Sequence, residues 1–133
     1  MGKRSMQKHS DWLAFAQDDL KAAEVLLNAE LGTIATFHTQ QSAEKALKAF
    51  LLCKKISFKK IHDLVVLIDL CSTVNQTFLD FAENCAKLDP YITQGRYPYG
   101  NGNPSRQTVL QAISYADKIL KKVETELSSS KRS

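Results

Sequence analysis

Apolar residues recur at helical spacing along five stretches of the chain, and the stretch from Ile34 to Lys55 is apolar over the widest arc. Residues placed at about 100° steps cover more than half of the helix circumference with apolar or small side chains: Ala35, Ala43, Ala46, Leu47, Phe50, Leu51 and Cys53. The remaining polar stripe consists of His38, Gln41, Glu44, Lys45 and Lys48. A helix with so wide an apolar surface is central rather than peripheral. We therefore expect residues 34–55 to form a central helix that the other helices cover.

The other four stretches predict helices over residues 10–28, 62–70, 75–89 and 104–127. Only five glycines and three prolines interrupt the chain, which favours helices over the frequent turns of an all-β protein. The short link before the central helix contains Gly32, which can adopt a left-handed conformation, and a link this short implies antiparallel helices. We expect an all-α, up-and-down bundle of four or five helices.

The predicted domain spans residues 10–127 as one unit, as the chain length also suggests. Residues 1–9 form a basic arm that we expect to be flexible, and residues 128–133 form a polar tail that we expect to be disordered. Asn103 and Pro104 make a suitable start for the last helix, because proline is favoured in the first helical turn.

Asp19 interrupts the apolar face of the first predicted helix. A carboxylate in such a position is expected to be buried or at an interface, where it requires a cation or hydrogen-bond donors. An ion pair that fixes helix register is one interpretation, and a carboxylate of a functional site is the other.

The formal net charge of +4 permits an anionic partner, although much of the excess lies in the two tails. The only internal basic cluster consists of Lys54, Lys55, Lys59 and Lys60. Clusters of this kind are more common at solvated helix ends than at phosphate sites, and both interpretations remain open.

Three cysteines in apolar surroundings form neither a disulfide framework nor a zinc pattern, which favours a reducing cytoplasm. Three scattered histidines make a metal site improbable, and no motif indicates a cofactor. No stretch reaches the roughly 18 apolar residues of a membrane span, and we expect neither a signal peptide nor a transmembrane helix.

The segment from Asp89 to Asn103 has an unusual composition, with Arg96 between prolines and close to Tyr97 and Tyr99. Arginine beside tyrosine suits the binding of an anion and stacking on a base. The alternative is a crossover whose tyrosines cap one end of the bundle. His62, beside a carboxylate and after a basic loop, is a stronger functional candidate than His38, although helix capping explains it equally well.

Four groups of residues together resemble the HEPN family (higher eukaryotes and prokaryotes nucleotide-binding domain). They are Trp12 with Ala16, Asp19, Leu20 and Ala23; the string from Phe37 to Ala49, FHTQQSAEKALKA; His62-Asp63-Leu64; and Arg96-Tyr97-Pro98. The string from the central helix is the most specific of these, and the resemblance extends over residues 10–127.

The resemblance implies a helical bundle that is often a homodimer and that accompanies small nucleotidyltransferases. Family members are associated with nucleotide binding, and many are ribonuclease toxins of toxin–antitoxin pairs. Those ribonucleases use an arginine followed, after four to six residues, by a histidine near the start of the last helix. Neither Arg96 nor Arg106 is followed by such a histidine, and Arg4 with His9 lies in the N-terminal arm, far from the family's position.

We therefore expect a nucleotide-binding protein or accessory subunit of a nucleotidyltransferase, without ribonuclease activity of its own. By analogy with the family, Arg96 contacts phosphate, Tyr97 or Tyr99 contacts the base, and Asp19 faces Arg96 or a lysine of the central helix. Gln41, Lys45 and Lys48 supply polar groups nearby. The alternatives are a divergent ribonuclease toxin that uses Arg96 with His62 or His38, and a purely structural homodimer whose interface is the polar stripe.

Overall fold

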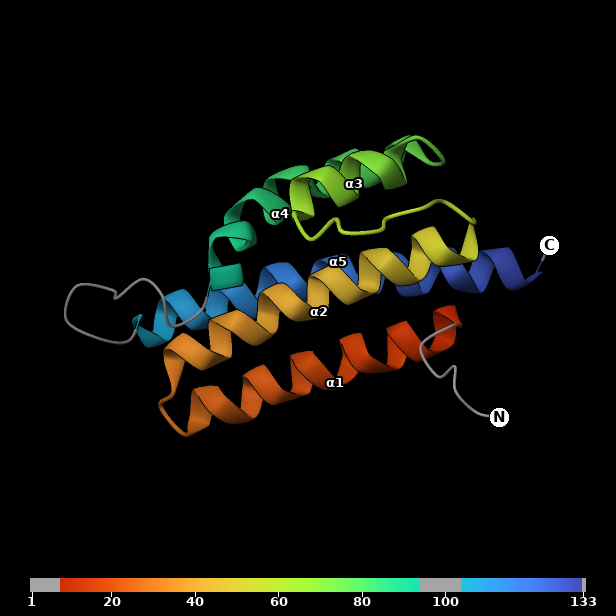
Figure 1. The fold of residues 1–133 in the computed structure, drawn as a ribbon. Coiled ribbons are helices and arrows are strands. Elements are labelled where there is room, and N and C mark those ends of the chain that lie inside the picture. The colour runs from red at the N-terminus through yellow and green to blue at the C-terminus, as the bar shows by residue number, and fades with distance from the viewer. Residues whose placement is uncertain (1–7, 94–103, 133) are drawn as a thin grey trace.

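The computed structural model describes residues 8–93 and 104–132 and contains helices but no strand within these ranges. Three long helices, α1 (His9–Asn28), α2 (Gly32–Cys53) and α5 (Arg106–Arg132), run up and down along one another. A second layer holds the shorter α3 (Leu64–Ser72) and α4 (Ala82–Leu88), with the 3₁₀ segments η2 (Gln76–Phe81) and η3 (Asp89–Thr93). Figure 1 shows α2 between α1 and this second layer, with α5 behind it. The prediction of an all-α bundle is confirmed.

Helix α2 is the central element, as its apolar pattern predicts. Ala35, Ala43, Ala46, Leu47 and Leu51 are fully buried, and Phe50 is 1% exposed. The main core joins all of these side chains except Ala35 to α1, α3 and α5, and it includes Phe78, whose ring centroid lies 4.5 Å from that of Phe50. Ala35 packs in a second, smaller cluster with Leu27 and Val109. Burial of this apolar area is the main source of stability of the bundle.

The turn between α1 and α2 contains a left-handed residue, but this residue is Glu30 and not the predicted Gly32. Glu30 has the positive φ angle of 62°, and the Leu31 amide donates to the Leu26 carbonyl at 2.9 Å. Gly32 is instead the first residue of α2, where an added Cβ would lie 3.1 Å from the carbonyl oxygen of Pro104. Gly32 therefore permits a close approach between the starts of α2 and α5.

The stretch predicted as one helix over residues 75–89 is divided. The Asn75 side chain accepts from the Thr77 amide at 3.0 Å and begins a tight 3₁₀ turn, and α4 starts only after Phe81. This turn places Phe78 in the core against Phe50. A hydrogen bond from a short polar side chain to a nearby amide competes with a continuous helix.

Both ends of α5 also differ from the prediction. The Thr108 amide donates to the Ser105 hydroxyl at 3.1 Å, so the cap lies at Ser105 and the helix begins at Arg106, not at Pro104. At the other end, α5 continues to Arg132, past the predicted helix end at Leu127. No glycine or proline follows Leu127 to end the helix.

Candidate functional site

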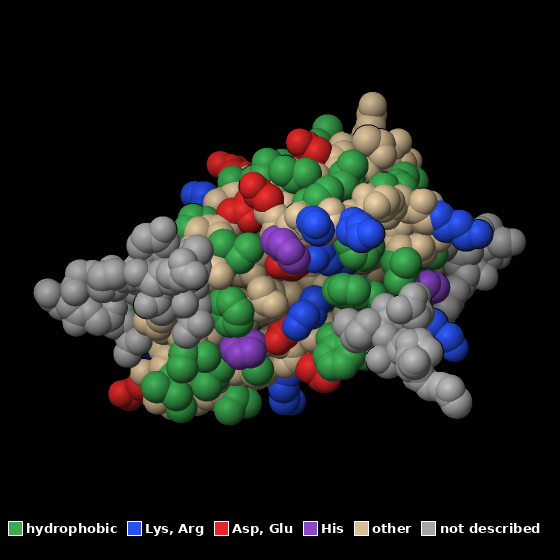
Figure 2. Space-filling model, viewed as in Figure 1, with side chains coloured by type: hydrophobic (Ala, Val, Ile, Leu, Met, Phe, Trp, Pro, Cys, Tyr) green, Lys and Arg blue, Asp and Glu red, His purple; other side chains and the backbone are tan. Residues whose placement is uncertain are grey.

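Two groups of charged side chains lie along the polar side of α2. The Asp19 cluster consists of Asp19, His38 and Lys45, and the Glu44 cluster consists of Glu44, Lys48 and His62. Each contains one carboxylate, one lysine and one histidine. Figure 2 shows histidine, lysine and acidic side chains gathered near the middle of the face over α2.

In the Asp19 cluster, one carboxylate bridges two residues of α2. The Lys45 ammonium lies 2.6 Å from Asp19 Oδ2, and His38 Nδ1 lies 2.9 Å from Asp19 Oδ1. The Asp19 side chain is 13% exposed, whereas Lys45 and His38 are 26% and 29% exposed. Asp19 was expected to be buried or at an interface and to face Arg96 or a lysine of the central helix; it is largely buried, and Lys45 is such a lysine.

The close packing of α1 on α2 holds the Asp19 cluster in place. Ala16 and Ala23 of α1 are fully buried, and the Ser42 hydroxyl of α2 donates to the Ala16 carbonyl at 2.7 Å. Small side chains let the two helices approach closely, and the hydroxyl bond fixes their register. Asp19 is therefore held opposite the same turns of α2 that carry His38 and Lys45.

The Glu44 cluster is more deeply buried than the Asp19 cluster. The Lys48 ammonium and His62 Nδ1 each lie 2.8 Å from Glu44 Oε2, and the Gln40 amide donates to Glu44 Oε1 at 3.2 Å. The Glu44 and Lys48 side chains are 9% and 6% exposed, whereas His62 is 60% exposed. One carboxylate oxygen therefore contacts both partners, and the Lys48 ammonium also lies 3.3 Å from His62 Nδ1.

Gln41 is joined to the Glu44 cluster through its neighbour Gln40 on α2. Its side-chain amide donates to Gln40 Oε1 at 2.7 Å, and Gln40 in turn donates to Glu44. Gln41, Lys45 and Lys48 therefore lie on the polar side of α2 as predicted, but each already has a partner within the protein.

Two aromatic rings adjoin the Glu44 cluster. The Lys48 ammonium lies 5.8 Å from the centroid of Trp12 and 5.4 Å from that of Phe58. The two rings meet edge to face with centroids 5.7 Å apart, and both are only partly buried. Aromatic faces next to a cation provide surfaces on which a base or another flat group can stack.

A hollow of about 510 Å³ lies beside His62 and is lined by Asp63, Ala86, Asp89, Pro90 and Ile92 as well. Asp89 caps α3 by accepting from the Leu64 amide at 2.7 Å and from the Val65 amide at 3.1 Å. Burial, followed by the neighbouring Asp63 side chain, raises the pKa of Asp89 from 3.8 to about 6, against the lowering effect of the two amides. Asp63 also caps α3, so the two carboxyl groups share the same helix end.

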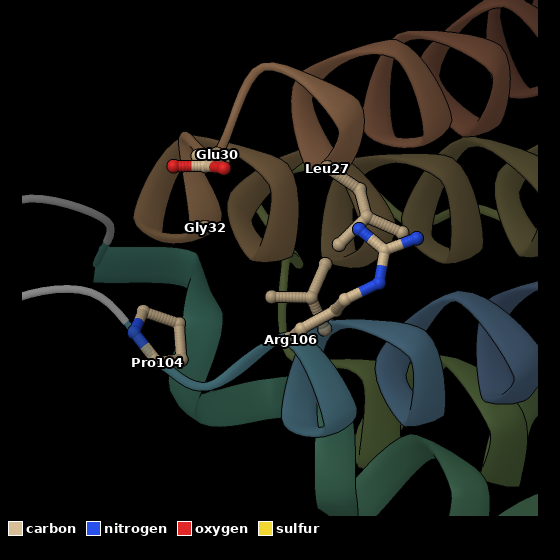
Figure 3. Close-up of a pocket in the computed structure, with 6 residues that line it drawn as sticks. Leu27, Glu30, Gly32, Pro104 and Arg106 are labelled. Atoms are coloured by element: carbon tan, nitrogen blue, oxygen red, sulfur yellow. The ribbon is translucent and has the colours of Figure 1, made fainter.

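A second hollow, of about 320 Å³, lies at the start of α2. Figure 3 shows Arg106 extending from α5 toward Leu27 of α1, with Glu30, Gly32 and Pro104 around the same pocket. None of the described residues that the sequence marked as candidates lines this hollow.

Arg96, Tyr97 and Tyr99, which the sequence marked as the phosphate-binding and base-binding residues, lie outside the described residues. The proposed contact between Asp19 and Arg96 therefore stays a prediction, while the alternative partner, Lys45, is present at 2.6 Å. Sequence reasoning missed Gln40 and Glu44 as site residues. The four-residue spacing of Gln40, Glu44 and Lys48 is the feature from which they could have been recognised.

The described part of the chain was also searched for reactive thiols, metal sites and membrane-spanning helices. Burial raises the pKa of the Cys71 and Cys85 thiols, the latter to about 12, so neither is a ready thiolate nucleophile. Within these residues no group of three or more His, Cys, Asp or Glu side chains is arranged to hold a metal ion. None of the described helices is long and apolar enough to span a membrane.

Comparisons with known proteins agree on one family. The family model of the HEPN domain matches residues 9–126. The fold is similar to that of an archaeal HEPN homologue, with 28% identity and a TM-score of 0.74 over 90% of this chain and 97% of the other. It is also similar to an HEPN domain protein from Thermotoga maritima, with 26% identity and a TM-score of 0.74 over 88% and 97% of the two chains.

A protein from Thermus thermophilus has 29% identity and a TM-score of 0.75, over 88% of this chain and 96% of the other. A comparison with curated proteins gives no match. The family match covers most of the chain and agrees with the arrangement of helices around α2. The chain therefore belongs to the HEPN domain family.

Proposed function

We propose that this protein binds a nucleotide over the polar side of α2 and acts as the accessory subunit of a small nucleotidyltransferase, without ribonuclease activity of its own. The observation that carries the proposal is the convergence of two lysines and two histidines, from α2 and the loop before α3, beside a pair of aromatic rings. Cations suit phosphate groups, and aromatic rings suit a base. The partner enzyme is inferred from the family alone.

Lys45 is the cation best suited to exchange partners. Its side chain is 26% exposed, whereas Lys48 is 6% exposed and enclosed by Glu44 and the aromatic rings. His38 contacts the same carboxylate as Lys45, so Asp19 would retain one partner if Lys45 turned toward a phosphate. In this proposal Arg96 supplies a further cation.

The proposal is tested by the melting temperature with and without millimolar ATP or GTP. A nucleotide at about 100 times its Kd adds about 2.7 kcal/mol, which corresponds to a rise of roughly 10 °C for a domain of this size. We expect Lys45→Gln and Arg96→Ala each to reduce this rise. Lys121→Gln is the matched control, because Lys121 is an exposed lysine paired with Asp117 on α5. Absence of a rise with either nucleotide, or a rise that both site variants retain, would contradict the proposal.

The ribonuclease alternative has one observation in its favour, the pairing of His62 Nδ1 with Glu44 at 2.8 Å. A carboxylate that orients an exposed imidazole is a common arrangement for proton transfer. If purified protein cleaved single-stranded RNA and His62→Ala abolished the cleavage, this alternative would replace the binding proposal.

A homodimer is the second partner that we propose. Phe15 and Ile34 are 46% and 37% exposed, and helical spacing places them next to Asp19 and His38 on the same faces of α1 and α2. A second copy would cover these apolar side chains and would bring opposite charges of the Asp19 cluster together across the interface. Analytical ultracentrifugation should show a dimer that Phe15→Ser dissociates. Val25→Ser is the control, because Val25 is 58% exposed and lies about 80° around α1 from Phe15 and about 120° from Asp19. A monomeric wild type would contradict this proposal.

A further inference from the structure

The segment from Lys45 to His62 contains six lysines and no acidic residue. Lys45 and Lys48 are neutralised by the carboxylates of the two clusters. The other four lysines lie in or next to the loop between α2 and α3, and Lys55, Lys59 and Lys60 are exposed. In the described part of the chain none of these three forms an ion pair. Figure 2 shows lysine side chains along the path that this loop follows in Figure 1.

Two lysines of the loop occupy backbone conformations that favour glycine. Lys55 and Lys60 have φ angles of 61° and 63°, in the left-handed region. A side chain in this region is less favourable than glycine, because its Cβ crowds the backbone. Lysine therefore occupies both positions although the backbone conformation is unfavourable for a residue with a side chain.

The loop lysines lie next to the aromatic rings of Phe58 and Trp12. Phe58 lies between Lys55 and Lys59 in the loop, and its ring meets Trp12 of α1 with centroids 5.7 Å apart. Partly buried aromatic rings bordered by lysines are typical of surfaces that bind single strands, where bases stack and lysines track the phosphates. An acidic peptide would use the lysines but not the rings.

We propose that the loop from Lys54 to Lys60, together with Trp12, binds single-stranded nucleic acid. Lys55, Lys59 and Lys60 contact the phosphate backbone, and a base packs against Trp12 and Phe58. This surface shares the Trp12 and Phe58 rings with the proposed nucleotide site, but its phosphate contacts are the loop lysines instead of Lys45.

The experiment measures the anisotropy of a fluorescein-labelled single-stranded RNA of roughly 12 nucleotides at several KCl concentrations. The triple variant Lys55→Gln, Lys59→Gln, Lys60→Gln should weaken binding at least tenfold. It should also reduce the slope of log K against log salt by about 2, because each phosphate contact of a single strand contributes about 0.7. Trp12 is the only tryptophan, so unlabelled RNA should also quench the tryptophan emission.

The matched control changes the same number of charges elsewhere. Lys87, Lys118 and Lys121 are exposed on α4 and α5, and their replacement by glutamine should leave RNA binding within about twofold. The loop variant should retain the ATP or GTP melting shift, which separates this proposal from the nucleotide site. Three results would overturn the proposal: no RNA binding at about 50 mM KCl, equal loss in both triple variants, or displacement of RNA by polyglutamate as effectively as by RNA.

Discussion

The Asp19 and Glu44 clusters have the same composition but different surroundings. Each joins one carboxylate to one lysine and one histidine on the same side of α2. Lys45 and His38 of the Asp19 cluster are both partly exposed, whereas Lys48 of the Glu44 cluster is 6% exposed under two aromatic rings. Only the histidine of the Glu44 cluster faces solvent widely, with 60% exposure.

The difference indicates how the two clusters divide their roles. A buried carboxylate must keep its cation, because an unpaired charge in the interior is costly. A partly exposed pair contributes little to stability and can exchange partners with a ligand. We therefore expect Lys48 to serve the fold and Lys45 to serve binding.

The largest effect is expected for Lys48→Met. This variant leaves Glu44 without its lysine while preserving much of the side-chain volume, and we expect a loss of about 3 kcal/mol in the free energy of unfolding. The double variant Glu44→Gln, Lys48→Met should recover most of this loss, because it removes both charges. Urea denaturation checks both values. A double variant as unstable as Lys48→Met would show that packing, not the unpaired charge, determines the loss.

A smaller effect on the free energy of unfolding is expected from a change of pH, because the Asp89 carboxyl group, which lines the same hollow as His62, titrates. Its pKa is raised to about 6 in the folded chain from 3.8, so its protonation stabilises the fold. This contribution is complete below about pH 4 and disappears as the pH rises through about 6. Solvent screening of this half-buried group limits the effect to about 1 kcal/mol.

Asp63→Asn tests the part of that contribution that comes from Asp63, because it removes the neighbouring carboxyl group, leaves the burial of Asp89 unchanged and keeps a side chain that can cap α3. The advantage of the variant over the wild type should be greater at pH 7 than at pH 4.5. The free energy of unfolding measured across this range checks the sign, and a difference that does not change with pH would contradict the assignment.

The smallest effect on stability is expected for Lys45→Gln. Its pair with Asp19 is partly exposed and His38 remains as a partner, so the loss should be below about 1 kcal/mol. Urea denaturation beside Lys48→Met checks the ranking. A larger loss for Lys45→Gln than for Lys48→Met would reverse the roles assigned to the clusters.

Much of the fold could be predicted from the helical spacing of apolar residues in the sequence. The wide apolar arc of residues 34–55 predicts a buried central helix, and α2 is that helix. The helix boundaries were less accessible because local hydrogen bonds determine them. Asn75 begins a 3₁₀ turn, and Ser105 instead of Asn103 lies at the start of α5.

The candidate site could be predicted from the sequence only in part. Asp19 was recognised because a carboxylate among apolar residues requires a partner on a neighbouring helix. The burial of Glu44 and Lys48 was not recognised, because their place on the polar stripe of α2 gives no information about the loop that covers them. That loop brings Phe58 and His62 over Lys48, and only the tertiary structure reveals this contact.

The hydrogen bond between Ser42 and the Ala16 carbonyl has a consequence for the order of folding. It joins α1 to α2 across a short connection, whereas α5 must reach α2 from more than fifty residues away in sequence. Closing the shorter loop loses less chain entropy, so we expect the α1–α2 pair to form first and α5 to dock later. Ser42→Ala should then slow refolding, whereas Val123→Ala in the buried face of α5 should mainly accelerate unfolding. The helix that closes the bundle would thus also be the first to leave it.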